Sequence, residues 1–167
     1  MFQEVILVNE ADEVIGTMEK LKAHQLGLLH RAFSVIIKND KGEILLQQRA
    51  RHKYHSGGLW TNTCSSHPNP GEETIAAAKR RLKEEMGIVC ELEPKGNILY
   101  NCEFENGLLE HELDHVFVGN SNAEPIINKE EVMEYRWMTA AALKNEVRDH
   151  PEYFTYWFLE LVKRDYL

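Results

Sequence analysis

Hydrophobic residues along this chain fall into short runs separated by polar turns, and the earliest runs predict β-strands. One run covers residues 5–8, and a second covers residues 33–37 and ends at the turn Asn39-Asp40-Lys41-Gly42. Residues 44–48 follow as the expected hairpin partner of the second run. Later runs predict strands at 98–104 and 108–118, on either side of Asn106-Gly107, and at 135–138.

A helical pattern replaces the strand pattern after the turn at Pro70-Gly71. Residues 74–86 place Ile75, Ala78 and Leu82 on one apolar face, and Gly87 is the expected C-terminal stop. Residues 140–147 and 153–164 predict two further helices on either side of His150-Pro151. Together the elements predict a mixed α/β fold, with β-sheets around one central helix and additional C-terminal helices, in a single domain over residues 1–167.

Composition and charge narrow the classes of partner. A chain of 167 residues fits one domain with its own core. The net charge of -8 argues against nucleic acid or membrane as a partner, but a bound metal would still allow an anionic small molecule. The three cysteines indicate a reducing compartment. The acidic N-terminus and the lack of an apolar run of ~20 residues predict no signal peptide and no membrane span, so we expect a cytoplasmic protein.

Charged residues on the predicted helix and in the loops suggest a phosphate site. Arg81 and Glu85 are four residues apart and share a helix face, where they could hold a diphosphate and its magnesium. The alternative is a solvated surface pair. A group of basic residues consists of Lys20, Arg49, Arg51 and Lys53. These residues could bind the same diphosphate, or they could lie in an ordinary loop that faces water.

A second group of residues has the chemistry of metal ligands. Glu110 and Glu112 are two apart on a predicted strand, so both face one way and His111 faces the other. Two such carboxylates either share a cation or raise each other's pKa, unless the face, which also carries Asp114, is exposed to solvent. Three histidines in predicted loops or strands would complete a site for manganese, iron or zinc, and they are His24, His30 and His67. Their spacing alone does not show that they converge.

These segments together resemble type 1 isopentenyl-diphosphate delta-isomerases, a branch of the Nudix-fold superfamily. The resemblance covers nearly the whole chain. It is carried by Met18-Glu19-Lys20, His24, Leu29-His30-Arg31-Ala32-Phe33-Ser34, Gln48-Arg49-Ala50, Leu59-Trp60-Thr61-Asn62, His67-Pro68, Gly71-Glu72, Arg80-Arg81, Glu85-Met86-Gly87, Glu110-His111-Glu112, Glu130-Glu131-Val132-Met133 and Trp157. The Nudix box is altered, because Arg81 replaces a glutamate that binds metal in typical hydrolases. The isomerase branch is similar at this position.

The resemblance implies a role for each matched residue. Glu85 would be the ligand of the Mg²⁺ that is bound with the substrate diphosphate. Trp157 would lie beside the hydrocarbon, and the alternative is that Trp157 only packs its helix. Tyr100 and Glu112 resemble the acid–base pair. A further divalent metal, Mn²⁺ or Zn²⁺, would be bound by His24, His30, His67, Glu110 and Glu112. The cationic clamp on the diphosphate would be Lys20, Arg49, Lys53 and Arg81.

The implied reaction converts isopentenyl diphosphate to dimethylallyl diphosphate in isoprenoid biosynthesis. It adds a proton at one carbon and removes another proton from its neighbour, through a tertiary carbocation that an indole ring can stabilise. The implied partner is therefore a small prenyl diphosphate, and we expect a monomer or weak dimer.

Ser65 stands where the family has its catalytic cysteine. In an extended segment the neighbouring Cys64 faces the other way, whereas His67 shares the side of Ser65. A hydroxyl is far less acidic than a thiol, so three accounts stay open: a slower isomerase with a proton relay, a deliberate substitution, or a different diphosphate reaction. We favour a natural serine variant that keeps the isomerase chemistry. The competing classes are a Nudix pyrophosphohydrolase acting on a nucleoside or isoprenoid diphosphate, and a module that only sequesters a prenyl diphosphate.

Overall fold

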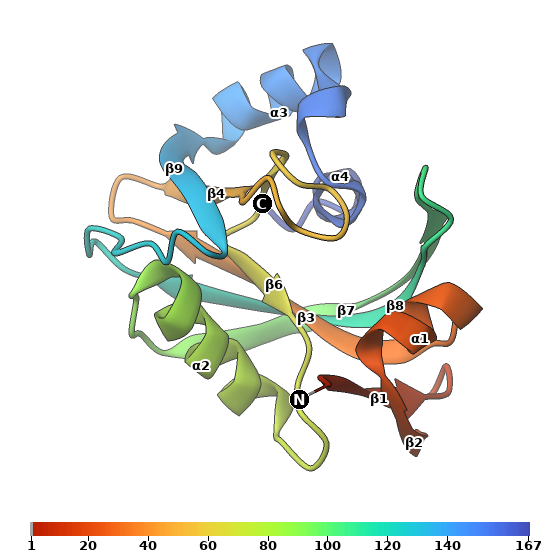
Figure 1. The fold of residues 1–167 in the computed structure, drawn as a ribbon. Helices are drawn as coiled ribbons and strands as arrows, with labels where there is room; N and C mark the ends of the chain where they lie inside the picture. The colour runs from red at the N-terminus through yellow and green to blue at the C-terminus, as the bar shows by residue number, and fades with distance from the viewer. Residues whose placement is uncertain (1) are drawn as a thin grey trace.

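The structure is a computed structural model that describes residues 2–167. Within these residues the strands form one connected sheet of nine strands (Figure 1). In chain order the elements are β1 (Glu4–Val8), β2 (Val14–Glu19), α1 (Lys20–Leu26), β3 (His30–Lys38), β4 (Glu43–Arg49), β5 (Trp60–Thr61), β6 (Cys64–Ser66), α2 (Thr74–Met86), β7 (Leu92–Glu103), β8 (Leu109–Asn120), β9 (Val132–Thr139), α3 (Ala140–Asp149), the 3-10 turn η1 (Pro151–Tyr153) and α4 (Tyr156–Lys163). The predicted mixed α/β class is confirmed.

Strand β3 lies at the centre of the sheet and contributes to both hydrophobic cores. It pairs in parallel with β8, from His30 opposite Glu112 to the strand end, and antiparallel with β6. Side chains alternate along a strand, so Phe33 and its odd-numbered neighbours enter the core that α2 covers. Ile36 enters the second core, which α4 covers on the other face of the sheet (Figure 1). The ends of β3 and β8 that carry His30 and Glu112 are thereby fixed side by side.

The helix predicted over residues 74–86 is confirmed with these bounds as α2. Ala78 and Leu82 are fully buried against the sheet, as the apolar face predicts. Gly87 ends the helix in the left-handed conformation, with φ of 67°, and its N–H donates to the Lys83 carbonyl. A side chain at this position would meet Ile126, whose carbonyl oxygen lies 2.9 Å from the Cβ it would carry. The stop therefore depends on glycine for two reasons, backbone conformation and space.

Three expectations about the elements are wrong in extent. The hairpin between the runs 33–37 and 44–48 has a single pair, Lys38 opposite Ile44, because β4 then pairs with β9 while β3 pairs with β6 and β8. The helix expected over 153–164 is interrupted: Phe154 and Thr155 are extended, and the Thr155 hydroxyl accepts from the N–H of Phe158 to begin α4. His24, expected in a loop or strand, lies on the short helix α1.

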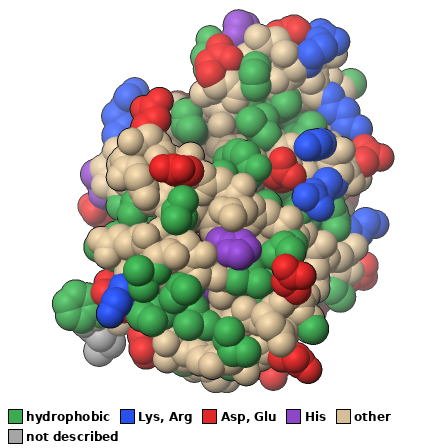
Figure 2. All heavy atoms as spheres, turned by 90° about the vertical axis from the view of Figure 1, so that its right-hand side faces the viewer, with side chains coloured by type: hydrophobic (Ala, Val, Ile, Leu, Met, Phe, Trp, Pro, Cys, Tyr) green, Lys and Arg blue, Asp and Glu red, His purple; other side chains and the backbone are tan. Residues whose placement is uncertain are grey.

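Hydrophobic side chains are also exposed on the face that carries α1, where Figure 2 shows them among charged groups. Leu21 and Leu26 of α1 and Ile15 of β2 are among the exposed residues.

None of the helices within residues 2–167 has both the length and the apolar character needed to cross a membrane.

We expect Gly87→Ala to destabilise the fold more than Gly42→Ala. Both glycines have positive φ, of 67° and 76°, so both variants carry the roughly 1–2 kcal/mol cost of a left-handed L-residue. A Cβ at Gly42 meets nothing within 4 Å, whereas at Gly87 it meets Ile126, which adds roughly 1–3 kcal/mol from overpacking. Urea denaturation would measure the free energy of unfolding. Equal losses in the two variants would contradict the role assigned to the Ile126 contact.

Candidate active site

A cavity of about 560 Å³ brings together residues from both halves of the chain. Its wall is formed by side chains from α2, α4, several strands and the loop between β4 and β5. The predicted residues that line it are Lys20, Arg49, Lys53, Ser65, His67, Arg81, Glu85, Tyr100, Glu110, Glu112 and Trp157. His24 and His30 lie beneath its surface and are fully buried.

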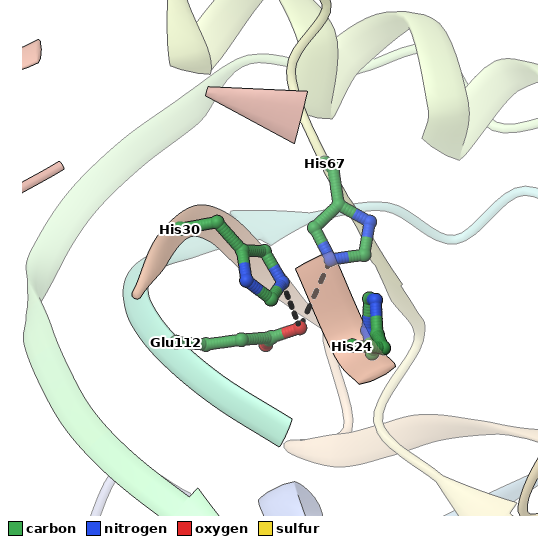
Figure 3. Close-up of side chains that lie close together, drawn as sticks. All are labelled: His24, His30, His67 and Glu112. Carbon is green, nitrogen blue, oxygen red and sulfur yellow. Dashed lines mark hydrogen bonds and ion pairs between the residues drawn. The ribbon is translucent and has the colours of Figure 1, made fainter. Parts of the chain in front are cut away.

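Three histidines and Glu112 converge on one point (Figure 3). One ligand atom from each residue lies within 4.8 Å of all the others. Glu112 Oε1 is 2.9 Å from His67 Nε2 and 3.3 Å from His30 Nε2. The parallel pairing of β3 with β8 accounts for the second contact, because it sets His30 directly opposite Glu112. His24 arrives separately, from α1.

The backbone fixes which ring nitrogen two of these histidines present. His24 Nδ1–H donates to the Lys20 carbonyl oxygen at 2.7 Å, and His30 Nδ1–H donates to that of Leu28 at 2.8 Å. Both Nε2 atoms are therefore left with lone pairs that face the centre. Burial lowers the pKa of His67 to about 3 and also lowers that of His24. Neutral imidazoles are the form that binds metal.

Glu110 belongs to the same cluster but faces a different side of it. Its Oε2 is 3.0 Å from His24 Nε2, and its Oε1 is 3.6 Å from Nε2 of His55. Burial raises the pKa of Glu110 well above its usual value, and the neighbouring charge of Glu112 adds to this effect. Glu110 Oε2 and His30 Nε2 are both buried, and although they lie close to His24 and Glu112, neither forms a hydrogen bond of normal geometry. This donor set of neutral imidazoles and carboxylates fits a divalent metal ion. The alternative of a solvent-exposed face is excluded by burial.

Cations gather at another part of the cavity around two glutamates. Arg81 donates to Glu85 Oε1 at 2.6 Å and also pairs with Glu131 Oε1 at 3.2 Å, while Lys53 pairs with the other oxygen of Glu131. The Glu85 side chain is buried, so the alternative of a solvated surface pair does not hold. Gln47, which sequence reasoning missed, donates to Glu85 Oε2 at 2.9 Å.

The other two residues predicted for the clamp, Lys20 and Arg49, are held over aromatic rings. Lys20 Nζ lies 4.9 Å from the ring centroid of Tyr54, and the Arg49 guanidinium lies 5.1 Å from that of Trp157. Burial, with a further contribution from Lys53, lowers the pKa of Lys20 to about 8. Lys20, Arg49, Lys53 and Arg81 thus all line the one cavity, together with Glu85 and Glu131, whose carboxylates pair with two of these cations.

Tyr100 and Glu112 are in direct contact. Strands β7 and β8 pair with Tyr100 opposite Glu112, and the tyrosine hydroxyl donates to Glu112 Oε2. Burial, together with the charge of Glu112, raises the pKa of Tyr100 well above its usual value. The pair therefore joins a neutral hydroxyl to a carboxylate whose other oxygen faces the histidines.

Ser65 is held on the cavity side of β6, opposite to Cys64. The Ser65 hydroxyl accepts from Asn62 Nδ2 at 2.9 Å and is 3.0 Å from the hydroxyl of Ser34. Ser34 in turn donates to Asp114 Oδ2 at 2.7 Å. The Cys64 side chain is fully buried in the core that α2 covers. The predicted opposite orientation of these two neighbours is confirmed, and His67 lies on the Ser65 side of the wall.

The apolar part of the cavity is aromatic. Trp157 is only 4% exposed and belongs to the core around α4, so it packs the helix and lines the cavity at the same time. His55 stacks on Phe104 with ring centroids 4.4 Å apart and meets Trp157 edge-on at 5.7 Å. Sequence reasoning missed His55 and Phe104, because neither belongs to a matched segment.

Comparisons with known proteins agree with this geometry. The NUDIX domain family profile matches residues 28–158. Isopentenyl-diphosphate Delta-isomerase from Pectobacterium atrosepticum is 52% identical over 155 residues, which is 93% of this chain and 87% of the relative. Isopentenyl-diphosphate Delta-isomerase 2 from Aromatoleum aromaticum is 46% identical over 164 residues, or 98% and 87% of the two chains.

Solved structures confirm the Nudix fold. The structure of DR0079 from Deinococcus radiodurans has a TM-score of 0.81 at 21% identity and covers 99% of this chain and 100% of its own. The MutT protein from Methanosarcina mazei has a TM-score of 0.66 at 23% identity, over 81% and 91% of the two chains. At these identities the likeness concerns the fold alone. The family profile and the near full-length relatives show that the chain belongs to the isopentenyl-diphosphate delta-isomerase family of Nudix-domain proteins.

Proposed function

We propose that this protein isomerises isopentenyl diphosphate to dimethylallyl diphosphate. The observation that carries the proposal is one cavity that combines a cationic region, an aromatic region and the Tyr100–Glu112 pair. The names of the relatives support the same reaction. Because residues from Lys20 on α1 to Trp157 on α4 contribute, we propose that the whole chain, residues 1–167, acts as a single catalytic domain.

The cationic region would bind the diphosphate and orient the small hydrocarbon tail. Arg81 and Lys53 share Glu131, whose two carboxylate oxygens hold both side chains in place. Phosphate oxygens would then compete with Glu131 for these cations. Glu85, buried beside Arg81, is the carboxylate placed to meet the Mg²⁺ that accompanies the diphosphate. Binding energy from the diphosphate would position the reacting carbons against the acid–base groups.

His24, His30, His67, Glu110 and Glu112 would hold a second divalent ion, which we propose to be Mn²⁺ or Zn²⁺. When bound, this ion supplies the positive charge that compensates two buried carboxylates and makes a proton on the Tyr100–Glu112 pair easier to donate. Glu112 is shared between the histidines and Tyr100, so the same residue belongs to both the metal site and the acid–base pair.

The residues on the wall suggest how the proton moves. The Tyr100–Glu112 pair would donate a proton to the terminal alkene carbon, and the π electrons of the alkene would form the new C–H bond. The resulting tertiary cation would face Trp157, whose indole stabilises positive charge. The C–H electrons of the neighbouring carbon would then form the new double bond as Ser65 Oγ accepts the released proton and passes its own proton along its hydrogen bonds. The hydroxyl is a weak base, so we expect a slow enzyme.

The hydrolase alternative is less well supported. A Nudix hydrolase uses a carboxylate at the position of Arg81, and here the arginine is paired with Glu85 and Glu131. Glu84 is partly exposed and pairs with Arg81 outside the cavity lining. The multi-metal carboxylate site of hydrolysis therefore lacks a ligand. The residues proposed for the isomerase lie around one cavity, with Ser65 at the position of the family's cysteine, and this favours isomerisation.

We expect the protein to convert isopentenyl diphosphate in D₂O, in the presence of Mg²⁺ and Mn²⁺, into deuterated dimethylallyl diphosphate. Proton NMR would follow the loss of the substrate olefinic signals and the exchange at the product methyl group. Release of inorganic phosphate or of a monophosphate would support the hydrolase instead. Saturable binding without turnover would indicate a protein that only sequesters the substrate.

We expect Ser65→Cys to raise kcat by about 10²-fold, the lower end of what a well-matched acid–base group contributes. A thiol ionises far more readily than a hydroxyl at the same position. The matched control is Cys64→Ala, which removes the neighbouring thiol and its 3.5 Å contact with Glu85 Oε2. Gln47 still donates to that oxygen, so we expect kcat to stay nearly unchanged. Loss of turnover in Cys64→Ala at unchanged stability would show instead that Cys64 takes part in catalysis.

A further inference from the structure

His55 is a buried titratable group of the cavity that has no role in the proposed mechanism. It lies in the segment between β4 and β5 and is 7% exposed. Its ring is fixed by stacking on Phe104 and by the edge of Trp157. Its Nδ1 is 3.1 Å from the hydroxyl of Ser56. The other nitrogen, Nε2, is consequently turned toward Glu110 and the histidine cluster.

The distance between His55 and Glu110 suits two ligands of one metal better than a hydrogen bond. His55 Nε2 and Glu110 Oε1 are 3.6 Å apart, which exceeds a normal N–H···O separation. Ligand atoms held about 2.0–2.2 Å from one ion lie roughly 3 Å apart when adjacent and about 4 Å when opposite. Ligand atoms of His24, His55 and Glu110 all lie within 4.8 Å of one another.

His24 links this group to the group formed by His30, His67 and Glu112. Its Nδ1–H donates to the Lys20 carbonyl, so Nε2 is the nitrogen that remains for an ion. A single nitrogen lone pair binds a single ion. At the spacing of the side chains the two groups stay distinct, since no set of ligand atoms within 4.8 Å joins His55 and Glu110 to all of the first group, and one ion shared through His24 would have to draw the two groups together.

We propose that His55 is a sixth protein ligand of the divalent metal, in addition to the five predicted ligands. The inference rests on the metal site of the proposed function and extends its ligand set to four imidazoles and two carboxylates. An ion held by all six of these residues would have no open position for water or substrate. Its effect on the reaction would then pass through Glu112, and the diphosphate would be left to Mg²⁺ and the cationic clamp.

The visible spectrum of the Co²⁺-loaded protein tests the inference without any turnover. His55→Phe keeps a ring that can stack on Phe104 but removes both nitrogens. Six-coordinate Co²⁺ absorbs weakly and five-coordinate Co²⁺ more strongly, so we expect a several-fold rise in visible absorption. The matched control is His52→Phe, because His52 lies in the same segment with a side chain that is 62% exposed. We expect the control to keep the wild-type spectrum.

The Mn²⁺-loaded His55→Ala protein gives a second readout and covers the case in which the phenylalanine variant does not fold. Here water can enter the vacated position, so we expect faster water-proton relaxation than in wild type. Competition with a chelator should show metal affinity lower by roughly 10-fold or more. Thermal unfolding of the metal-free proteins checks that each variant is folded.

An unchanged Co²⁺ spectrum in a folded His55→Phe protein would overturn the inference. So would weaker metal binding with no change in either spectrum or relaxation, because His55 would then only support Glu110 from outside the coordination sphere. Failure of wild type to bind Co²⁺ or Mn²⁺ would overturn the metal site and the sixth ligand together. A protein that binds the metal through His55 but leaves the substrate unchanged would uphold this inference while contradicting the proposed activity.

Discussion

Two buried carboxylates, Glu110 and Glu112, set the constraint on which the rest of the site depends. Each is at most 5% exposed, and ionising both in a site that excludes water is costly unless a cation is shared between them. Neutral imidazoles lie beside the two carboxylates, and their lone pairs face the same point. A bound metal ion would satisfy both demands, because it would compensate the carboxylates and bind nitrogens such as His30 Nε2, which has no hydrogen-bond partner. The site is therefore organised around a positive charge that the side chains themselves do not provide.

The fold brings these groups together mainly through two strand pairs that share β8. Parallel pairing of β3 with β8 puts His30 beside Glu112, and antiparallel pairing of β7 with β8 puts Tyr100 on the other side of Glu112. Glu112 is thus fixed by two register-defined neighbours on adjacent strands. A register shift of one residue would turn its side chain to the opposite face of the sheet. The placement of Tyr100 beside Glu112, the proposed acid–base pair, is therefore set by the pairing of the strands.

Those parts of the fold and of the candidate site that follow from local rules could be predicted from the sequence. Helical periodicity and Gly87 set the bounds of α2, and strand alternation placed Glu110 and Glu112 on one face. Non-local packing decided the rest. The hairpin after Lys38 separates because β9, far along the chain, competes for β4. His55 carries no spacing signal, since its place in the site follows from the path of a loop and from the Phe104 ring beneath it.

The alternation of side chains along β6 also decides whether Cys64 can replace the cysteine that the family has at the position of Ser65. Cys64 and Ser65 are adjacent, yet Cys64 faces the core and Ser65 faces the cavity, where it is bonded to Asn62 and close to Ser34. A thiol moved by one position along a strand is moved to the opposite face, so Cys64 does not replace what Ser65 lacks. Its burial raises the pKa of its thiol, which further removes it from proton transfer. In the proposed mechanism, proton removal on the β6 side of the cavity therefore falls to the Ser65 hydroxyl and the hydrogen bonds that hold it, while Tyr100 and Glu112 supply the other proton.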